Sequence, residues 1–141
     1  MEDDAVGEGA VDRAVKALAR RDHSSASLKA KLLRAGVPAD ASEHAIDTLA
    51  RAGYVDDMRF ALDRAEHLAA KGYGDEWIRG DLEGQGAPAD DAIAALGPEN
   101  ARAEREAERL GGGVKALQTL ARRGFSEESL EPLLHSTTGE E

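Results

Sequence analysis

Few side chains in this sequence have the types and spacing that chemistry at an active site requires. The four histidines, at positions 23, 44, 67 and 135, are scattered, and none has a partner at the spacing of a metal site. Asp56 and Asp57 form a carboxylate pair, but adjacent side chains diverge, and the first of them is placed to cap a helix. The sequence therefore predicts no catalytic residue, no metal site and no enzymatic activity.

The glycine and cysteine content also excludes several kinds of site. Gly111–Gly113 is followed by Val-Lys and not by the Lys-Ser/Thr of a phosphate-binding loop, so we expect a helix break and hinge there. Cysteine is absent, which excludes disulfides, a thiol nucleophile and any zinc site with a cysteine ligand. We expect no cofactor.

One aromatic pair has the spacing of a binding anchor. Tyr73 and Trp77 lie four residues apart, beside the acidic Asp75 and Glu76. Residues four apart share one face of a helix, and a partly exposed tryptophan is a frequent hot spot of protein interfaces. Burial at a helix start is the alternative, and it stays open.

Basic side chains form the other candidate surface. The net charge is −10, yet residues 11–72 are slightly basic while residues 73–97 carry six acids and one base. The whole-chain charge argues against tight nucleic-acid binding, because phosphate contacts need a basic face. A local cluster keeps a weak or indirect DNA contact open, and Arg122–Arg123 either interact with a helix dipole or bind a partner or phosphate. The strongest basic stretch comprises Arg13, Lys16, Arg20, Arg21, Lys29, Lys31 and Arg34.

Short helices must position these residues, and no segment alternates as a strand does. Apolar spacing and capping residues predict nine helices. They begin near Val11, after Ser24, at an Asp40–Glu43 capping box, after Asp56, and at residues 75, 88, 100, 114 and 126. The fifth runs over 75–83, the sixth over 88–96 and the seventh over 100–110, and Pro132 is expected to shorten or kink the ninth.

The helices fall into three groups of three. The aligned stretches are LKAKLLRAG (28–36), IRGDLEGQG (78–86) and ALQTLARRG (116–124). Each ends in a glycine and is followed by a turn and another helix, which indicates a repeat. Small repeats bury their apolar faces against neighbours, so we expect an all-α protein of three tandem three-helix repeats in an elongated, curved array. The expected segments are an acidic disordered leader (1–10), repeats at 11–53, 54–97 and 98–136, and an acidic tail (137–141).

Four stretches in this order resemble the RecX family, which regulates the RecA recombinase. They are ALARRDHSSASLKAKLLRAGV (17–37), GYVDDMRFA (53–61), KGYGDEWIRGDL (71–82) and LARRGFSEESL (120–130), and the second is the most specific. The resemblance implies three tandem three-helix repeats. It also implies a non-enzymatic regulator of DNA repair, recombination and the SOS response, which binds the RecA filament and inhibits its ATPase, coprotease and strand-exchange functions.

The sequence departs from the family pattern in two places. Ser27 stands where the family usually has an acidic residue that completes a capping box with Ser24. The family's middle repeat is often basic near the region matching 75–83, but four acids lie here against one base. We therefore hypothesise that this acidic region meets a basic strip of the recombinase. Its acids are Asp75, Glu76, Asp81 and Glu83.

Two other classes of protein stay open. A nucleic-acid-binding helical repeat would use the basic face of residues 13–34, and an adaptor would bind a partner other than RecA. We expect a cytoplasmic monomer, because there is no apolar run of membrane length, no secretory signal and no heptad seam. The residues expected to contact a partner are Arg20, Arg21, Lys29, Lys31, Arg59, Tyr73, Asp75, Glu76, Trp77, Arg79, Arg122 and Arg123.

Overall fold

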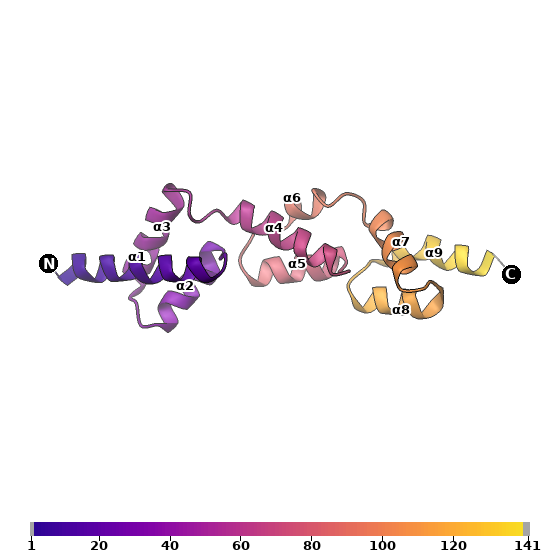
Figure 1. Ribbon diagram of the computed structural model, residues 1–141, viewed down its shortest axis with the longest axis horizontal. Coiled ribbons are helices and arrows are strands. Elements are labelled where there is room, and N and C mark those ends of the chain that lie inside the picture. The colour runs from indigo at the N-terminus through magenta and orange to yellow at the C-terminus, as the bar shows by residue number, and fades with distance from the viewer. Residues whose placement is uncertain (1, 140–141) are drawn as a thin grey trace. The chain divides into compact units, whose positions relative to one another are not determined.

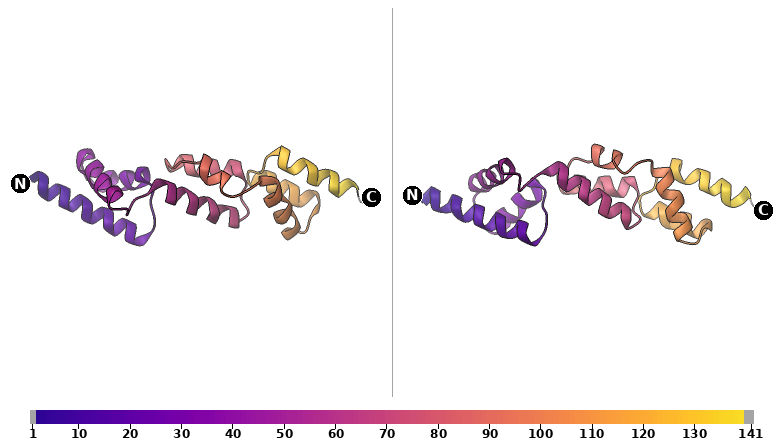
Figure 2. Two further views of the ribbon diagram at one scale, coloured as in Figure 1. Left: turned by 90° about the horizontal axis from the view of Figure 1, so that it is seen from above. Right: turned by 45° about the horizontal axis from the view of Figure 1, so that its top comes forward.

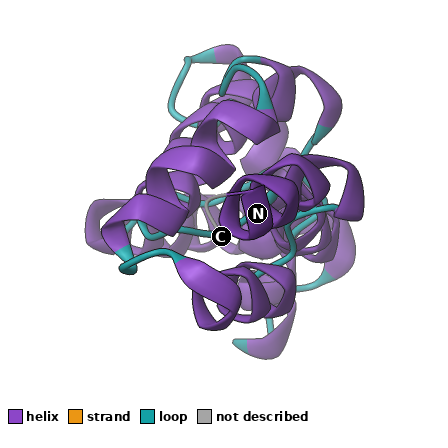
Figure 3. Ribbon diagram, turned by 90° about the vertical axis from the view of Figure 1, so that its right-hand side faces the viewer, coloured by secondary structure: helices purple, strands orange, loops and turns teal. Residues whose placement is uncertain are grey.

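The computed structural model describes residues 2–139, with side chains for residues 6–135. This part of the chain contains helices and connecting loops but no strand, as Figures 1 and 3 show. The prediction of an all-α fold is confirmed. The helices are α1 (Glu2–Arg20), α2 (Ser25–Arg34), α3 (Ala39–Arg51), α4 (Asp57–Ala70), α5 (Asp75–Gly84), α6 (Asp90–Ala94), α7 (Glu99–Arg109), α8 (Gly113–Arg122) and α9 (Glu127–Gly139).

Local sequence signals fix several helix ends. The Ser24 hydroxyl accepts a hydrogen bond from the Ser27 N–H at 3.0 Å, and Asp56 caps α4 by accepting from the Arg59 N–H at 3.0 Å. The second helix of each repeat ends at a glycine with positive φ, a conformation that costs glycine little. These glycines are Gly36, Gly86 and Gly124.

The chain folds as two compact units. The first comprises Met1–Ala61 with Gly84–Ala87. Within it, α1 packs on α2 and α3, as Figures 1 and 2 show. Leucines and alanines close this small core, which is the thin packing expected from an alanine-rich sequence. Its buried members are Ala14, Ala17, Leu28, Leu32, Leu49 and Val55.

The second unit comprises Leu62–Glu83 with Pro88–Glu141. Here α7, α8 and α9 pack on one another around Ala103, Ala107, Ala116, Leu120 and Phe125. The boundary between the units falls inside α4, so the compact units do not coincide with the three repeats. The three-helix repeat arrangement itself is confirmed, while the boundaries at residues 53 and 97 remain a prediction.

Helices extend toward both ends of the described part of the chain. Residues 2–10 belong to α1, and buried Ala10 extends the packed face of this helix, while the acidic leader at 1–10 as a separate segment stays a prediction. Residues 1–10 carry four acids and no base, and this excess of charge is why the sequence favoured disorder there. At the other end α9 continues to Gly139, and residues 1, 140 and 141 lie outside the described part.

Three helix details also differ. The Asp40–Glu43 capping box is wrong: α3 begins after Pro38 without a side-chain cap, and Glu43 pairs with Lys29. α6 is only five residues long, shorter than the predicted 88–96. Pro132 lies inside α9, which continues past it as a 13-residue helix. A proline removes one backbone hydrogen bond, and packing against α7 and α8 can offset that loss.

Candidate partner-binding surface

The same contact between consecutive repeats occurs once in each unit. In the first, Asp57 accepts a hydrogen bond from the backbone N–H of Ser25 at 2.6 Å. In the second, Glu99 accepts from the backbone N–H of Asp75 at 2.7 Å. Each acid is the first residue of its own helix, and each N–H donor is the first residue of the preceding repeat's second helix. A carboxylate thus stabilises each of these helix starts.

Near each of these contacts, a glycine turn lies close against the neighbouring helix. A Cβ atom on Gly86 would lie 2.5 Å from the Cβ of Ala26, and one on Gly124 would lie 2.5 Å from the backbone nitrogen of Trp77. Gly86 and Gly124 are aligned in the repeat, and both have positive φ. Only glycine allows this approach without displacing the neighbouring helix. The backbone around Trp77 is therefore held in a fixed position within its unit.

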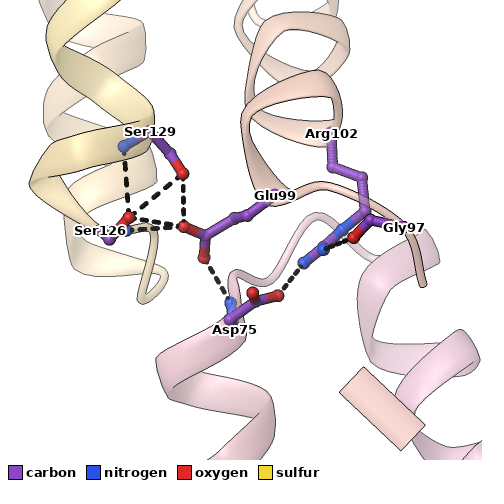
Figure 4. Close-up of polar contacts among 6 residues, drawn as sticks. All are labelled: Asp75, Gly97, Glu99, Arg102, Ser126 and Ser129. Atoms are coloured by element: carbon purple, nitrogen blue, oxygen red, sulfur yellow. Dashed lines mark hydrogen bonds and ion pairs between the residues drawn. The ribbon is translucent and has the colours of Figure 1, made fainter. Parts of the chain in front are cut away.

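Glu99 is the centre of a polar cluster that joins α5, α7 and α9 (Figure 4). Besides the Asp75 N–H, its carboxylate accepts hydrogen bonds from the Ser126 N–H at 3.1 Å and from the Ser126 hydroxyl at 2.7 Å. The Ser129 hydroxyl donates a fourth bond, at 2.6 Å. Burial raises the pKa of Glu99, but the bonds from Ser129, Ser126 and Asp75 outweigh it, and the pKa lies below its ordinary value.

The Asp75 side chain belongs to the same cluster. Its carboxylate accepts a hydrogen bond at 2.7 Å from Nη2 of Arg102, a residue only 8% exposed (Figure 4). Asp81 likewise forms a two-pronged ion pair with Arg64, at 2.9 and 2.8 Å. Arg102 is buried, so breaking its ion pair would leave an uncompensated charge, and Asp75 thereby stabilises the fold. Arg64 and Asp81 are only half-buried.

A stacked aromatic pair, half-buried Tyr73 and exposed Trp77, lies beside this cluster. The rings of Tyr73 and Trp77 stack with centroids 4.6 Å apart and planes inclined by 13°, and Trp77 is 46% exposed. The structure brings Arg122, which the sequence had singled out separately, together with Trp77 and its neighbour Glu76 in one shallow hollow. This hollow is lined by Glu76, Trp77, Gly80, Asp81, Ala121, Arg122 and Gly124.

The two remaining predicted arginines of this unit are engaged in ion pairs. Arg123 lies 3.4 Å from Glu106. Arg79 forms an ion pair of 2.6 Å with Asp90 and a longer one of 3.9 Å with Glu83. Both side chains therefore have acidic partners within their own unit.

The basic residues of the first unit have different surroundings. Arg20, Arg21 and half-buried Lys31 have no ion pair with any described carboxylate, whereas Lys29 pairs with Glu43 at 2.6 Å. Arg59 is exposed, but its guanidinium donates to the backbone oxygens of Gly53 and Tyr54 at 3.2 and 3.4 Å. Of the predicted cations in this unit, Arg20, Arg21 and Lys31 are thus available to an anionic partner.

His23 is a buried residue whose environment the sequence did not reveal. Its ring is 1% exposed, and Nδ1 lies 3.0 Å from the Ser27 hydroxyl, while Nε2 has no hydrogen-bond partner among the described residues. Burial lowers the pKa of His23 below 6.5, and the nearby charges of Arg21 and Lys31 lower it further.

The described residues contain no group of three or more histidine, cysteine or acidic side chains that could hold a metal ion. Within the same part of the chain, no helix is both long and apolar enough to cross a membrane. The arrangement offers exposed surfaces and a shallow hollow, which suit binding to a partner.

Comparisons with known proteins agree with this picture. A family model described as "RecX, first three-helix domain" matches residues 10–49. Two crystal structures share the fold. One, of regulatory protein RecX, has a TM-score of 0.77 at 20% identity and covers 91% of this chain and 72% of that one. The other, of RecX from Lactobacillus salivarius, has a TM-score of 0.76 at 17% identity and covers 95% and 97%.

Curated relatives are more similar in sequence. "Regulatory protein RecX" of Xanthomonas axonopodis pv. citri (strain 306) is 38% identical over 133 residues, covering 85% of this chain and 82% of that protein. The protein of the same name from Stenotrophomonas maltophilia (strain R551-3) is 35% identical with the same coverage. An identity of this size over most of both chains, together with the shared fold, shows that the chain belongs to the RecX family.

Proposed function

We propose that this protein binds the RecA recombinase filament and inhibits its ATPase, coprotease and strand-exchange activities, and thereby modulates DNA repair and recombination. The observation that carries the proposal is the 38% identity to a regulatory RecX protein over 85% of the chain. We further propose that it acts as a cytoplasmic monomer without enzymatic activity of its own.

The hollow at Trp77 is the surface of the second unit that best suits a protein partner. An aromatic side chain that is already held in place loses little conformational entropy on binding, which is typical of interface hot spots. Tyr73 supports one face of the Trp77 ring, and the Gly124 turn holds its backbone. Glu76 and Arg122 flank the ring with opposite charges that can orient the partner.

Two of the four acids in residues 75–83 are the candidates for a contact with a basic strip of the recombinase. Asp75 and Asp81 form ion pairs of 2.7 and 2.8 Å with arginines. Exposed Glu76 has no ion pair among the described residues, and exposed Glu83 has only the longer pair of 3.9 Å with Arg79, so these two acids are the better candidates for such a contact. Reversing both to lysine is expected to weaken inhibition by at least about tenfold in the concentration required. The matched control is Glu104→Lys with Glu108→Lys, which changes two exposed acids of α7. Equal effects of the two double variants would contradict a specific acidic contact.

The test of the function itself is a titration into cognate RecA on single-stranded DNA, with ATP hydrolysis as the readout. The emission of Trp77, the one tryptophan in the chain, reports binding in the same experiment. Inhibition is expected to weaken when Trp77 is replaced by alanine, while circular dichroism shows that the helices remain. Unchanged hydrolysis at saturating wild-type protein would contradict the proposal.

A nucleic-acid contact remains a second candidate because of the first unit. Arg20, Arg21 and Lys31 lack ion-pair partners among the described residues, and such cations can release counterions from a phosphate backbone. A DNA-binding function predicts affinity for DNA alone that falls steeply with salt and is reduced when these three residues are changed to glutamine. An adaptor for another protein predicts neither DNA binding nor inhibition of the recombinase.

A further inference from the structure

In the first two repeats, a basic residue at one repeat position links the second helix to the third. Lys29 of α2 lies 2.6 Å from Glu43 of α3, and Arg79 of α5 lies 2.6 Å from Asp90 of α6. Both cations occupy the second position of the aligned stretches at 28–36 and 78–86. Each ion pair therefore spans the second and third helices of its repeat.

The third repeat has an acid at the position of Glu43 but no base at the position of Lys29. Leu117 stands at the aligned position in α8, and Glu131 follows it by 14 residues, the same separation as that between Lys29 and Glu43. Among the described residues, the only ion pair of Glu131 is with His135, at 3.7 Å, and it requires a protonated imidazole. His135 lies on α9 itself, so no cation reaches Glu131 from α8.

An apolar groove lies where the first repeat has this ion pair. It encloses about 570 Å³ between α8 and α9, and Val114 and Leu134 on its walls are 53% and 45% exposed. Glu127 and Glu131, one turn apart on α9, give it an acidic edge. Exposed apolar residues gathered in one groove are typical of interaction sites. The complete lining is Val114, Leu117, Gln118, Ala121, Glu127, Leu130, Glu131, Leu134 and His135.

We propose that this groove binds an amphipathic segment of a protein partner that carries a lysine or arginine. Apolar side chains of the segment contact Val114, Leu117 and Leu134, and its cation pairs with Glu131 as Lys29 pairs with Glu43. The acidic edge disfavours nucleic acid and anionic lipid, because both present phosphates to the surface. This inference does not depend on the identity of the partner, so it can be tested independently of the proposed function.

The first repeat suggests a variant whose own side chain would occupy the groove. In Leu117→Lys, the new side chain takes the place of Lys29 in the first repeat and is expected to pair with Glu131. The fold should tolerate this change, because the first repeat already contains the same pair at the same separation. Circular dichroism and thermal unfolding of the full chain verify that the helices and their stability are kept. A second variant, Glu131→Lys, removes the acid at a side chain that is 70% exposed.

The probe is a fluorescein-labelled helical peptide of leucine and lysine, and a leucine–glutamate peptide of the same pattern is the control. Fluorescence anisotropy is measured at about 0.15 M salt, where exposed charges more than about 8 Å apart are largely screened. The wild-type chain should bind the lysine peptide and not the glutamate peptide. Leu117→Lys and Glu131→Lys should each weaken binding by at least about tenfold. The charge-matched controls Ala50→Lys and Glu104→Lys, at exposed sites elsewhere, should change it less than about twofold.

Two results would overturn the inference. One is a Leu117→Lys chain that is folded and binds the lysine peptide as tightly as wild type. The other is a loss of affinity in the controls equal to that of the groove variants, because binding would then follow net charge alone. A protein that binds the lysine peptide through this groove but leaves RecA uninhibited would contradict the proposed function and not the groove.

Discussion

Replacing Glu99 should destabilise the second unit more than replacing any exposed residue of the same helix. Its carboxylate accepts four hydrogen bonds of 2.6–3.1 Å from Asp75, Ser126 and Ser129. A hydrogen bond to a charged group contributes about 1.5–3 kcal/mol, and bonds to one shared carboxylate are not additive. Removing the carboxylate in Glu99→Ala should therefore cost about 3 kcal/mol, because Ser129 is buried and loses its acceptor.

Glu99→Gln separates the charge of this side chain from its shape. Its amide oxygen can still accept from the two serines, but the amide NH2 group then faces the N–H of Asp75. We expect a cost of about 1–2 kcal/mol for this unpaired donor. The assay is urea unfolding followed by the emission of Trp77, which lies in the same unit. With a urea dependence of about 1–3 kcal/mol/M, Glu99→Ala should lower the midpoint by about 1 M or more.

A matched control distinguishes the polar cluster from a general effect of charge removal. Glu104→Gln changes an exposed acid of α7 that has no ion pair among the described residues, and it should alter the unfolding free energy by less than about 0.5 kcal/mol. If the Glu99 variants unfold at the same urea concentration as this control, the argument that the cluster holds α5, α7 and α9 together is refuted.

The remaining predictions concern a buried imidazole and two glycine turns. The folded-state pKa of His23 lies below 6.5, so the unfolded chain takes up a proton that the folded chain resists, and stability should fall as the pH drops below 6.5. His23→Gln should flatten this dependence in urea unfolding followed by circular dichroism between about pH 7 and pH 5. Gly124→Ala should cost about 3 kcal/mol, because φ is +88° and the new Cβ meets the backbone of Trp77. Gly36→Ala, with φ of +89° and open space, should cost about 1 kcal/mol in the same unfolding assay; equal costs would show that the close approach is unimportant.

The sequence predicted those features that depend on neighbouring residues. Ser24 and Asp56 cap the helices that they were expected to cap, since a cap needs only a donor two or three residues ahead. The aligned glycines predicted the repeat because a helix end with positive φ favours glycine whatever surrounds it. The Asp40–Glu43 box failed because α3 begins at Ala39, which places Asp40 inside the helix and not at its N-cap. Glu43 pairs instead with Lys29, 14 residues away.

The polar cluster could not have been predicted in this way. Glu99 meets partners 24 to 30 residues away, and only the packing of three helices brings them together. Asp75 was grouped with the partner-facing acids because it lies in an acidic stretch, yet its carboxylate pairs with buried Arg102. The hydrophobic periodicity of the sequence cannot distinguish an acid that forms an ion pair from one that does not on the same stretch. Glu76 and Glu83 are therefore the acids of this stretch that we expect to contact a basic strip of the recombinase.

The proposed function is tested most directly by ATP hydrolysis of the cognate RecA filament on single-stranded DNA during a titration with this protein, with a parallel measurement of binding to DNA alone. The account predicts that hydrolysis falls at well below one protein per recombinase subunit, while binding to DNA alone stays weak. A hydrolysis rate that does not change at saturating protein would contradict it.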